Sequence, residues 1–364
     1  MSSGTIVLKF LGIVLIGTIL LIGFRFVRAA NLLSPLDEVD RACWTLEAPA
    51  GPEDLVIDRA RGFAYVSATD RRILMQGGAD SDRPIGGIYR IDLKEPSENW
   101  HLVPMKTGAV ASFRPHGIGL FIAEDGQRSL SVVNHPANGP DEVVVFMVDS
   151  KGMLEYHRTI SDPLMADLND VQPVGQDSFY ATNDHGTTPS TALQDFLVLD
   201  RASLVYFDGA RAVIAAGDLT YANGVNVSPD GEEIYVAETL DRRLRIYRRE
   251  IASGVLELSE MLMLGTGVDN IDVLENGDLL VGGHAKILDF AGHAEDATAL
   301  SPSQVVLVPR GPELPRTVRT IYLNDGQEIS GLAVAAGYGD LMLMGPVFDS
   351  KILVCKQEIM LPPE

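Results

Sequence analysis

Acidic and amide side chains recur at corresponding places along this chain. The groups are Glu53-Asp54, Asn169-Asp170, Asn223 and Asp269-Asn270, and each directly precedes a short apolar run. Carboxylate and amide oxygens are hard donors, and calcium takes roughly six to eight of them. Zinc would require cysteine or clustered histidine, and magnesium prefers a stricter octahedral geometry. Asp and Asn are also common in ordinary turns, so only their repetition predicts a calcium site.

Four of the seven histidines lie near the ends of expected strands. They are His116, His135, His185 and His284, in the contexts PHG, NHP, NDH and GGH. Imidazole titrates near neutrality and can accept a proton from an attacking water. A lone histidine is more often a hydrogen-bonded structural residue, so we expect the pair His116 and His135 to be catalytic. Asp184, His185 and His284 are candidates for a supporting place behind the metal ligands.

Nucleophilic-serine chemistry has no support in the sequence. The chain contains no G-x-S-x-G elbow, and it also lacks the HExxH motif and the P-loop. The formal net charge of -21 would repel phosphate backbones, which argues against binding of nucleic acid. We therefore expect a metal-assisted reaction on a small molecule.

The elements that must position these groups recur six times. Each repeat has an apolar run, a polar turn with glycine, and a second alternating run. The turn glycines lie 46 to 64 residues apart, at Gly62, Gly126, Gly175, Gly231, Gly277 and Gly339. This spacing predicts an all-β fold, a six-bladed β-propeller over residues 31–364, whose equivalent positions meet around one axis. A β-sandwich is the alternative, but it does not require this coarse period.

A hydrophobic segment precedes the repeats. From Thr5 to Phe24 the only charged residue is Lys9, and about 20 apolar residues are enough for a membrane-spanning helix. We expect residues 1–30 to be a retained signal anchor or a signal peptide cleaved near Val27-Arg28-Ala29. The length of the run and its basic flanks favour retention. Both outcomes send the domain into the secretory pathway, either membrane-anchored or extracellular.

The two cysteines, Cys43 and Cys355, lie at opposite ends of the folded region. A disulfide between them would tie the two ends of the domain together, and the expected secretory compartment would support it. Two unrelated buried thiols are the alternative.

Together, these motifs resemble the serum paraoxonase/arylesterase family, from Cys43 to Cys355. The matching segments are GPEDL at Gly51, SFRPHGI at Ser112, VVNHP at Val132, LNDV at Leu168, TNDH at Thr182, YANGVNVSPDG at Tyr221, VDNI at Val268 and VGGH at Val281. The resemblance implies a six-bladed propeller that hydrolyses lactones and aryl esters with two calcium ions in its tunnel. It also implies a disulfide between the first and last blades.

The resemblance further implies a role for each matched residue. The upper, catalytic ion would be bound by Glu53, Asn169, Asn223, Asp269 and Asn270. The deeper, structural ion would be held by Asp54, Asp170 and the backbone carbonyl of Ile118, and the family's histidine dyad matches His116 and His135. Residues 67–87 and 285–301 do not follow the family pattern closely, so the resemblance leaves the aryl pocket undefined.

Two other functions would fit a propeller. A sugar-lactone hydrolase or a strictosidine-synthase-like protein would use other ligands or no metal, and a non-enzymatic propeller would present its surface to partners. The contiguous EDL, NDV and DNI motifs argue against the first, and the ligand-type residues near His116 argue against the second. We therefore expect a small-molecule ester or lactone as substrate, with the membrane as a partner through the amino-terminal segment.

Overall fold

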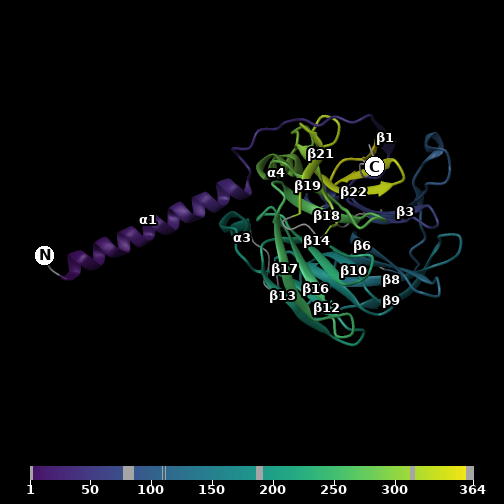
Figure 1. Ribbon diagram of the computed structural model, residues 1–364, viewed down its shortest axis with the longest axis horizontal. Coiled ribbons are helices and arrows are strands. Elements are labelled where there is room, and N and C mark those ends of the chain that lie inside the picture. The colour runs from purple at the N-terminus through teal and green to yellow at the C-terminus, as the bar shows by residue number, and fades with distance from the viewer. Residues whose placement is uncertain are drawn as a thin grey trace.

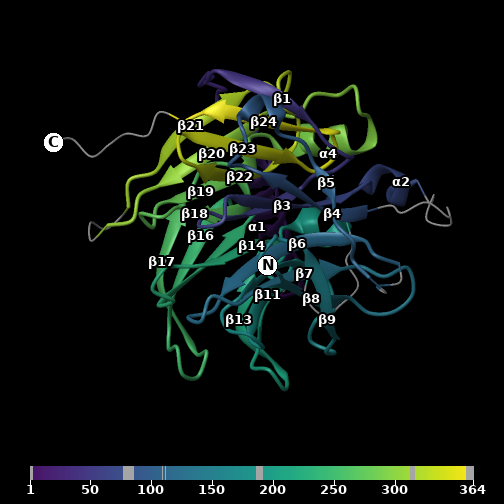
Figure 2. The same ribbon diagram turned by 90° about the vertical axis from the view of Figure 1, so that its right-hand side faces the viewer.

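The computed structural model describes residues 3–76, 86–108, 110, 112–185, 192–311 and 316–357. Within these residues, 24 strands form six four-stranded antiparallel sheets. Figure 2 looks approximately along the central tunnel, with the innermost strands near the centre and the outermost strands at the rim. The predicted six-bladed β-propeller is therefore confirmed.

The first three blades run outwards from the tunnel in chain order. Blade one contains β2 (Asp54–Asp58), β3 (Phe63–Thr69), β4 (Gly86–Asp92) and β5 (Val103–Pro104). Blade two contains β6 (Pro115–Ile122), β7 (Arg128–Asn134), β8 (Glu142–Val148) and β9 (Leu154–Ile160). Blade three contains β10 (Leu168–Pro173), β11 (Phe179–Asn183), β12 (Ala202–Phe207) and β13 (Ala212–Leu219).

The next two blades repeat this order, and the last one departs from it. Blade four contains β14 (Ala222–Val227), β15 (Glu233–Glu238), β16 (Arg243–Arg249) and β17 (Leu256–Met263). Blade five contains β18 (Gly267–Val273), β19 (Leu279–His284), β20 (Ser303–Val308) and β21 (Arg319–Asn324). Blade six contains β22 (Leu332–Tyr338), β23 (Leu341–Pro346), β24 (Lys351–Lys356) and, at its outer edge, β1 (Cys43–Glu47).

Blade six is therefore closed by the amino-terminal strand. In the register of β1 and β24, Cys43 stands opposite Cys355, and the two form a disulfide across 312 residues of sequence. The predicted bridge is confirmed, and the alternative of two separate thiols is wrong. The hydrophobic core lies between the blades; Leu55 and Val66 of blade one, for example, pack against Val334 and Val354 of blade six.

Three short helices gather on one face of the propeller. They are α2 (Arg71–Met75), α3 (Ala192–Leu197) and α4 (Ile287–Glu295), and each follows the second strand of its blade. Because that strand runs antiparallel to the innermost one, the three helices lie at the face where the innermost strands begin. A 3₁₀ turn, Ser97–Asn99, connects β4 to β5.

The amino-terminal helix α1 (Ser3–Ala29) projects away from the propeller on the side of α3 and α4 (Figure 1). Within Lys9–Ala29, an 18-residue window has a mean hydropathy of 2.4, and no residue of that window is buried. At about 1.5 Å per residue, Lys9–Ala29 is long enough to cross the hydrocarbon core of a bilayer. The predicted hydrophobic helix is therefore present, and it is a candidate membrane anchor.

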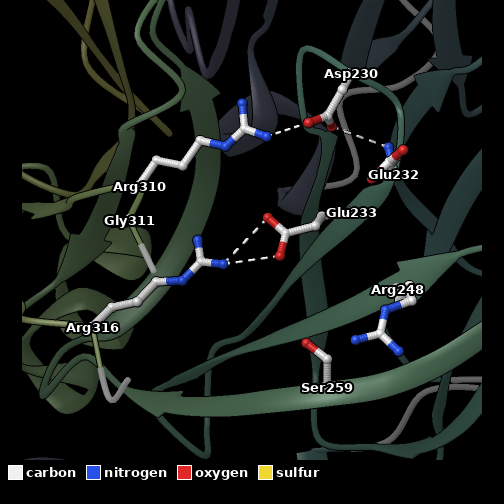
Figure 3. A pocket seen from close by; sticks show the side chains of 8 residues that line it. All are labelled: Asp230, Glu232, Glu233, Arg248, Ser259, Arg310, Gly311 and Arg316. Carbon is white, nitrogen blue, oxygen red and sulfur yellow. Dashed lines mark hydrogen bonds and ion pairs between the residues drawn. The ribbon is translucent and has the colours of Figure 1, made fainter. Parts of the chain in front are cut away.

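A groove of about 390 Å³ separates blades four and five at their outer part (Figure 3). Two of its three arginines form ion pairs across it: Arg310 with Asp230, and Arg316 with Glu233 at 2.9 and 3.2 Å. These ion pairs join the start of β15 to the segment after β20. These ion pairs therefore hold blades four and five together across the groove.

Candidate metal centre and active site

The predicted metal-binding residues of blades three to five lie on β-bulges of the innermost strands. In β10, Leu168 pairs with Asn183 and Val171 with Ala181, so two residues face one on the partner strand. Besides this bulge at Asn169-Asp170, the same two-against-one register occurs at His116-Gly117, Asn223-Gly224 and Asp269-Asn270. Successive side chains of a regular strand point to opposite faces, whereas a bulge re-aims one of them. The bulges therefore direct polar side chains towards the tunnel.

Contacts between blades bring these residues together at the hub. The Asn270 amide Nδ2 lies 3.3 Å from both the backbone oxygen and Oε1 of Glu53, which joins blade five to blade one. A Cβ on Gly117 would stand only 2.4 Å from Cα of Asp170, and a Cβ on Gly224 would stand 2.7 Å from Cα of Asn270. Glycine at these two bulges thus allows the innermost strands to approach closely.

The hub carries a ring of candidate metal ligands, which are Glu53, Asp54, Asn169, Asp170, Asn223, Asp269 and Asn270. Four acceptor oxygens of this ring are buried without a hydrogen-bond donor among the described residues. They are the Oδ1 atoms of Asn169, Asn223, Asp269 and Asn270, whose exposed fractions are 5% or less. Leaving a buried polar atom unpaired costs about 1–3 kcal/mol, so four of them on the contacting innermost strands β10, β14 and β18 indicate a binding site for a cation. Carboxylate and amide oxygens without cysteine are the donors that calcium takes. The residues therefore fit a calcium ion.

The other polar atom of three ring side chains is held by a neighbour, which fixes the direction of each Oδ1. The contacts are Asn169 Nδ2 to Asp184 Oδ2 at 3.5 Å, Asn223 Nδ2 to Thr239 Oγ1 at 3.2 Å, and Asp269 Oδ2 to His284 Nε2 at 2.9 Å. Such outer contacts orient the ligands of a metal site. Asp184 and His284 thus stand where supporting residues were expected, whereas sequence reasoning missed Thr239.

Asp54 and Asp170 differ from this upper group because backbone N–H groups occupy both oxygens of each carboxylate. Asp54 accepts from Leu55 at 2.8 Å and from Ile118 at 2.6 Å. Asp170 accepts from Val171 at 2.7 Å and from Val225 at 2.8 Å. The main chain of Ile118 therefore lies beside Asp54, and the two carboxylates are locked into the innermost strands.

Burial raises the pKa values of three of the four carboxyl groups at the hub. It raises the pKa of Asp170 to about 7, and it raises the pKa of Asp269 as well. Burial also raises the pKa of Asp54 well above its usual value, and repulsion from Asp170 and Glu53 adds to this effect. For Glu53, burial acts in the same direction, but His116 and a neighbouring arginine outweigh it and lower the pKa to about 2. This crowding of acids favours a divalent cation at the hub.

The two predicted catalytic histidines are hydrogen-bonded to each other at the edge of the ring. His116 Nε2 lies 3.4 Å from Oε1 of Glu53, and His116 Nδ1 lies 2.9 Å from Nε2 of His135. His116 is the more buried of the two, with 18% of its side chain exposed against 34% for His135. The pair therefore forms a chain of ring nitrogens that leads from the candidate metal ligands towards the surface.

The comparisons with known proteins agree with this geometry. The family model of the arylesterases matches residues 69–357. The chain belongs to the arylesterase family. It is 31% identical to human serum paraoxonase/arylesterase 2 over 348 residues, which cover 92% of this chain and 96% of the relative. It is 34% identical to human serum paraoxonase/arylesterase 1 over 318 residues, which cover 84% and 86%. The protein is therefore an enzyme, a carboxylic ester hydrolase.

Solved structures with low sequence identity to this chain share the propeller fold. A luciferin-regenerating enzyme aligns with a TM-score of 0.53 and 12% identity, over 87% of this chain and 96% of its own. A protein described as a gluconolactonase aligns with a TM-score of 0.52 and 14% identity, over 88% and 94%. At such low identity these structures indicate the fold alone.

Arg71 and Phe290, which contact residues of the candidate site, come from the two stretches that depart from the family pattern. From α2, Arg71 Nη2 contacts Glu53 Oε2 at 3.0 Å. From α4, Phe290 stacks on the ring of His284 with 3.7 Å between centroids, and Phe348 lies behind it. Residues 77–85 of the first stretch lie outside the described residues. Sequence reasoning missed Arg71 and Phe290 because no repeated motif marks them.

His185 is enclosed by carboxylates and is fully hydrogen-bonded. Its Nδ1 lies 2.7 Å from Asp184 and its Nε2 lies 2.8 Å from Asp195. Burial would lower the pKa of His185, but Asp167, Asp184 and Asp195 raise it to about 12. Asp167, Asp184 and His185 have the composition of a small metal site, yet both ring nitrogens of this charged histidine are donors. His185 therefore holds Asp184 in its contact with Asn169.

Proposed function

We propose that this arylesterase-family protein hydrolyses lactones and aryl esters at a calcium centre in its tunnel. The observation that carries the proposal is the convergence of four donor-free acceptor oxygens near the hydrogen-bonded pair of His116 and His135. Membership of the family supports the reaction class, and the similar relatives are named paraoxonase/arylesterase. The ring alone would fit a structural cation, whereas the adjacent histidines supply a base.

We assign two calcium ions to the hub. Glu53, Asn169, Asn223, Asp269 and Asn270 would bind the catalytic ion. Asp54 and Asp170, with the carbonyl of Ile118, would hold a deeper structural ion. The four carboxylates of this set would balance the charge of two divalent ions, which supports two ions rather than one.

The chain's own groups have distinct roles in the proposed reaction. When bound, calcium supplies a Lewis acid that polarises the substrate carbonyl and stabilises charge on its oxygen. His116 takes a proton from the attacking water, and His135 supports it through their hydrogen bond. Arg71 holds Oε2 of Glu53, which leaves Oε1 towards His116 and Asn270. Phe290 supplies an apolar wall for the substrate.

Removal of the metal or of a ligand charge tests the proposed function. Hydrolysis of an aliphatic lactone and of phenyl acetate should be lost in EGTA and should return when calcium is added. Glu53→Gln and Asp269→Asn should each lower kcat/KM by about 100-fold or more, because each removes a charged ligand from the buried site. Calcium binding by titration calorimetry should weaken in parallel.

Asp230→Asn is the matched control, because it makes the same chemical change in an ion pair at the outer groove. This variant should retain wild-type activity and calcium affinity. Full activity of Glu53→Gln and Asp269→Asn, or of the wild type in EGTA, would rule out the calcium mechanism. The similarity to a gluconolactonase does not support a sugar-lactone hydrolase, because at 14% identity it indicates the fold alone.

We further propose that α1 is retained and anchors the enzyme in a membrane of the secretory pathway. Arg25 near the end of the helix pairs with Asp200 at 2.8 Å, and Asn31 donates to the carbonyl of Ala285 at 2.7 Å. These contacts fix the base of α1 on the face that carries the ring residues. The disulfide supports an oxidising compartment for the propeller.

A further inference from the structure

The loop between β7 and β8 brings an acidic residue to the histidine pair. The loop begins at His135 and ends at Asp141, six residues later. Oδ1 of Asp141 lies 2.8 Å from Nδ1 of His135, and Oδ2 accepts the backbone N–H of Leu168, also at 2.8 Å. Leu168 directly precedes Asn169. One carboxylate therefore contacts both the dyad and the strand that carries a candidate calcium ligand.

Donor and acceptor rules then determine the proton positions along the chain of rings. A carboxylate only accepts hydrogen bonds, so the proton of a neutral His135 lies on Nδ1. Its Nε2 is then an acceptor, and the proton of His116 must lie on Nδ1, 2.9 Å away. Two neutral imidazoles supply two protons for three contacts, and the contacts of 2.8 and 2.9 Å are shorter than the 3.4 Å between His116 Nε2 and Glu53 Oε1. Nε2 of His116 is therefore the nitrogen left without a proton.

We propose that Asp141 is a positioning residue that sets the tautomers of His135 and His116 and so exposes the basic nitrogen of His116 to the reacting water. The consequence for catalysis rests on the proposed function, whereas the two tautomers do not. Orientation of a histidine by a buried carboxylate is a general device in acid–base catalysis.

The surroundings of the loop hold Asp141 in place. Asn134 Nδ2 donates to Glu142 Oε1 at 2.7 Å, and Asn134 Oδ1 accepts the backbone N–H of Arg114, also at 2.7 Å. In the middle of the loop, the N–H of Ala137 donates to Ser112 Oγ at 2.7 Å. Because the loop is fixed by contacts of its own, the carboxylate of Asp141 can be changed without removing the support of the loop.

Asp141→Asn separates the tautomer role from a merely structural one. An amide has one acceptor oxygen, and the buried N–H of Leu168 requires it. The amide NH₂ would then face Nδ1 of His135, which would move the proton of His135 to Nε2 and the proton of His116 to its own Nε2. We expect kcat to fall by about 100-fold, the scale of general-base catalysis, with KM changed by less than about threefold.

Glu142→Gln, at the first residue of β8 and directly after Asp141, is the matched control. It removes one negative charge, keeps an acceptor for Asn134 and contacts neither histidine, so kcat should stay within about twofold of wild type. Calcium affinity should be unchanged in both variants. Wild-type kcat in Asp141→Asn would overturn the inference, as would an equal loss of kcat in Glu142→Gln.

NMR spectroscopy determines the histidine tautomers independently of enzyme activity. Full-length protein labelled with ¹⁵N-histidine should give long-range ¹H–¹⁵N correlations with protonated Nδ1 for both His116 and His135. Asp141→Asn should shift both protons to Nε2. A wild-type His135 protonated on Nε2 would refute the inference even if the enzyme were fully active. A wild type that hydrolyses no ester or lactone would instead refute the proposed function.

Discussion

The hub contains four buried carboxyl groups, those of Glu53, Asp54, Asp170 and Asp269. In the calcium-free protein, burial raises the pKa of three of these groups and only Glu53 keeps a low pKa. Each of the three raised groups therefore binds its proton more tightly in the folded state than in the unfolded state. Folding without calcium is consequently coupled to proton uptake at the hub.

This coupling predicts how the effect of calcium on stability depends on pH. A raised carboxyl pKa contributes stability that is present below the unfolded value of 3.8 and is lost as pH rises through the folded value, about 7 for Asp170. Glu53, with a pKa of about 2, stays ionised throughout this window. The gap in Tm between calcium-loaded and calcium-free protein should therefore be small near pH 4 and should widen up to about pH 7.

Thermal unfolding followed by circular dichroism, in resin-treated buffer with and without calcium, measures this gap. The comparison at each pH cancels the titration of surface groups, which the two samples share. A gap that stayed constant or narrowed from pH 4 to pH 7 would contradict the coupling.

At the residue scale, the sequence predicts the polar residues that occupy the same position in successive repeats. Asn169, Asn223 and Asp269 could be predicted because each begins the same kind of apolar run. Asp141, Arg71 and Thr239 could not be predicted, because they lie in a loop, a short helix and a strand end without any shared pattern. Their proximity to the hub depends on the tertiary fold, so only the folded structure reveals their contacts.

Among the elements, the bulged innermost strands decide how many side chains reach the tunnel. The sequence pattern predicts that the acidic and amide residues directly precede the strands. In the structure, those of β10, β14 and β18 lie within the strands. A regular strand would send Asp269 and Asn270 to opposite faces. The bulges bring both to the hub, and no residue pattern announces them, because register depends on the partner strand.

The pairing of β1 with β24 gives a prediction for the stability of blade six. Replacing both cysteines, as Cys43→Ser with Cys355→Ser, should destabilise the folded protein by about 2–5 kcal/mol, because the bridge restricts a very long loop in the unfolded chain. Urea unfolding of the double variant and of the wild type measures the difference. Calcium affinity should change little, since blade six supplies none of the proposed ligands. A wild-type midpoint in the double variant would mean that the strand pairing alone closes the propeller.

For the molecule as a whole, α1 leaves the propeller on the face that carries the ring residues. The proposed membrane anchoring through α1 can be tested. The retained helix should keep the full-length protein in the membrane pellet after carbonate extraction, and removal of residues 1–30 should release an active soluble propeller. N-terminal sequencing of the membrane-bound protein should find the chain intact before Ala29. A purified native protein that began at residue 30 would instead indicate a cleaved signal peptide.

The sharing of blade six between the two ends of the chain also constrains biosynthesis. A ribosome must release Lys351–Lys356 before β1 can find its partner strand and before Cys43 can find its partner thiol. Until then the nascent chain carries an open sheet edge, which is a template for association with other chains. A stop codon before residue 351 would thus leave blade six without β24, β1 without its partner strand and Cys43 without its partner thiol.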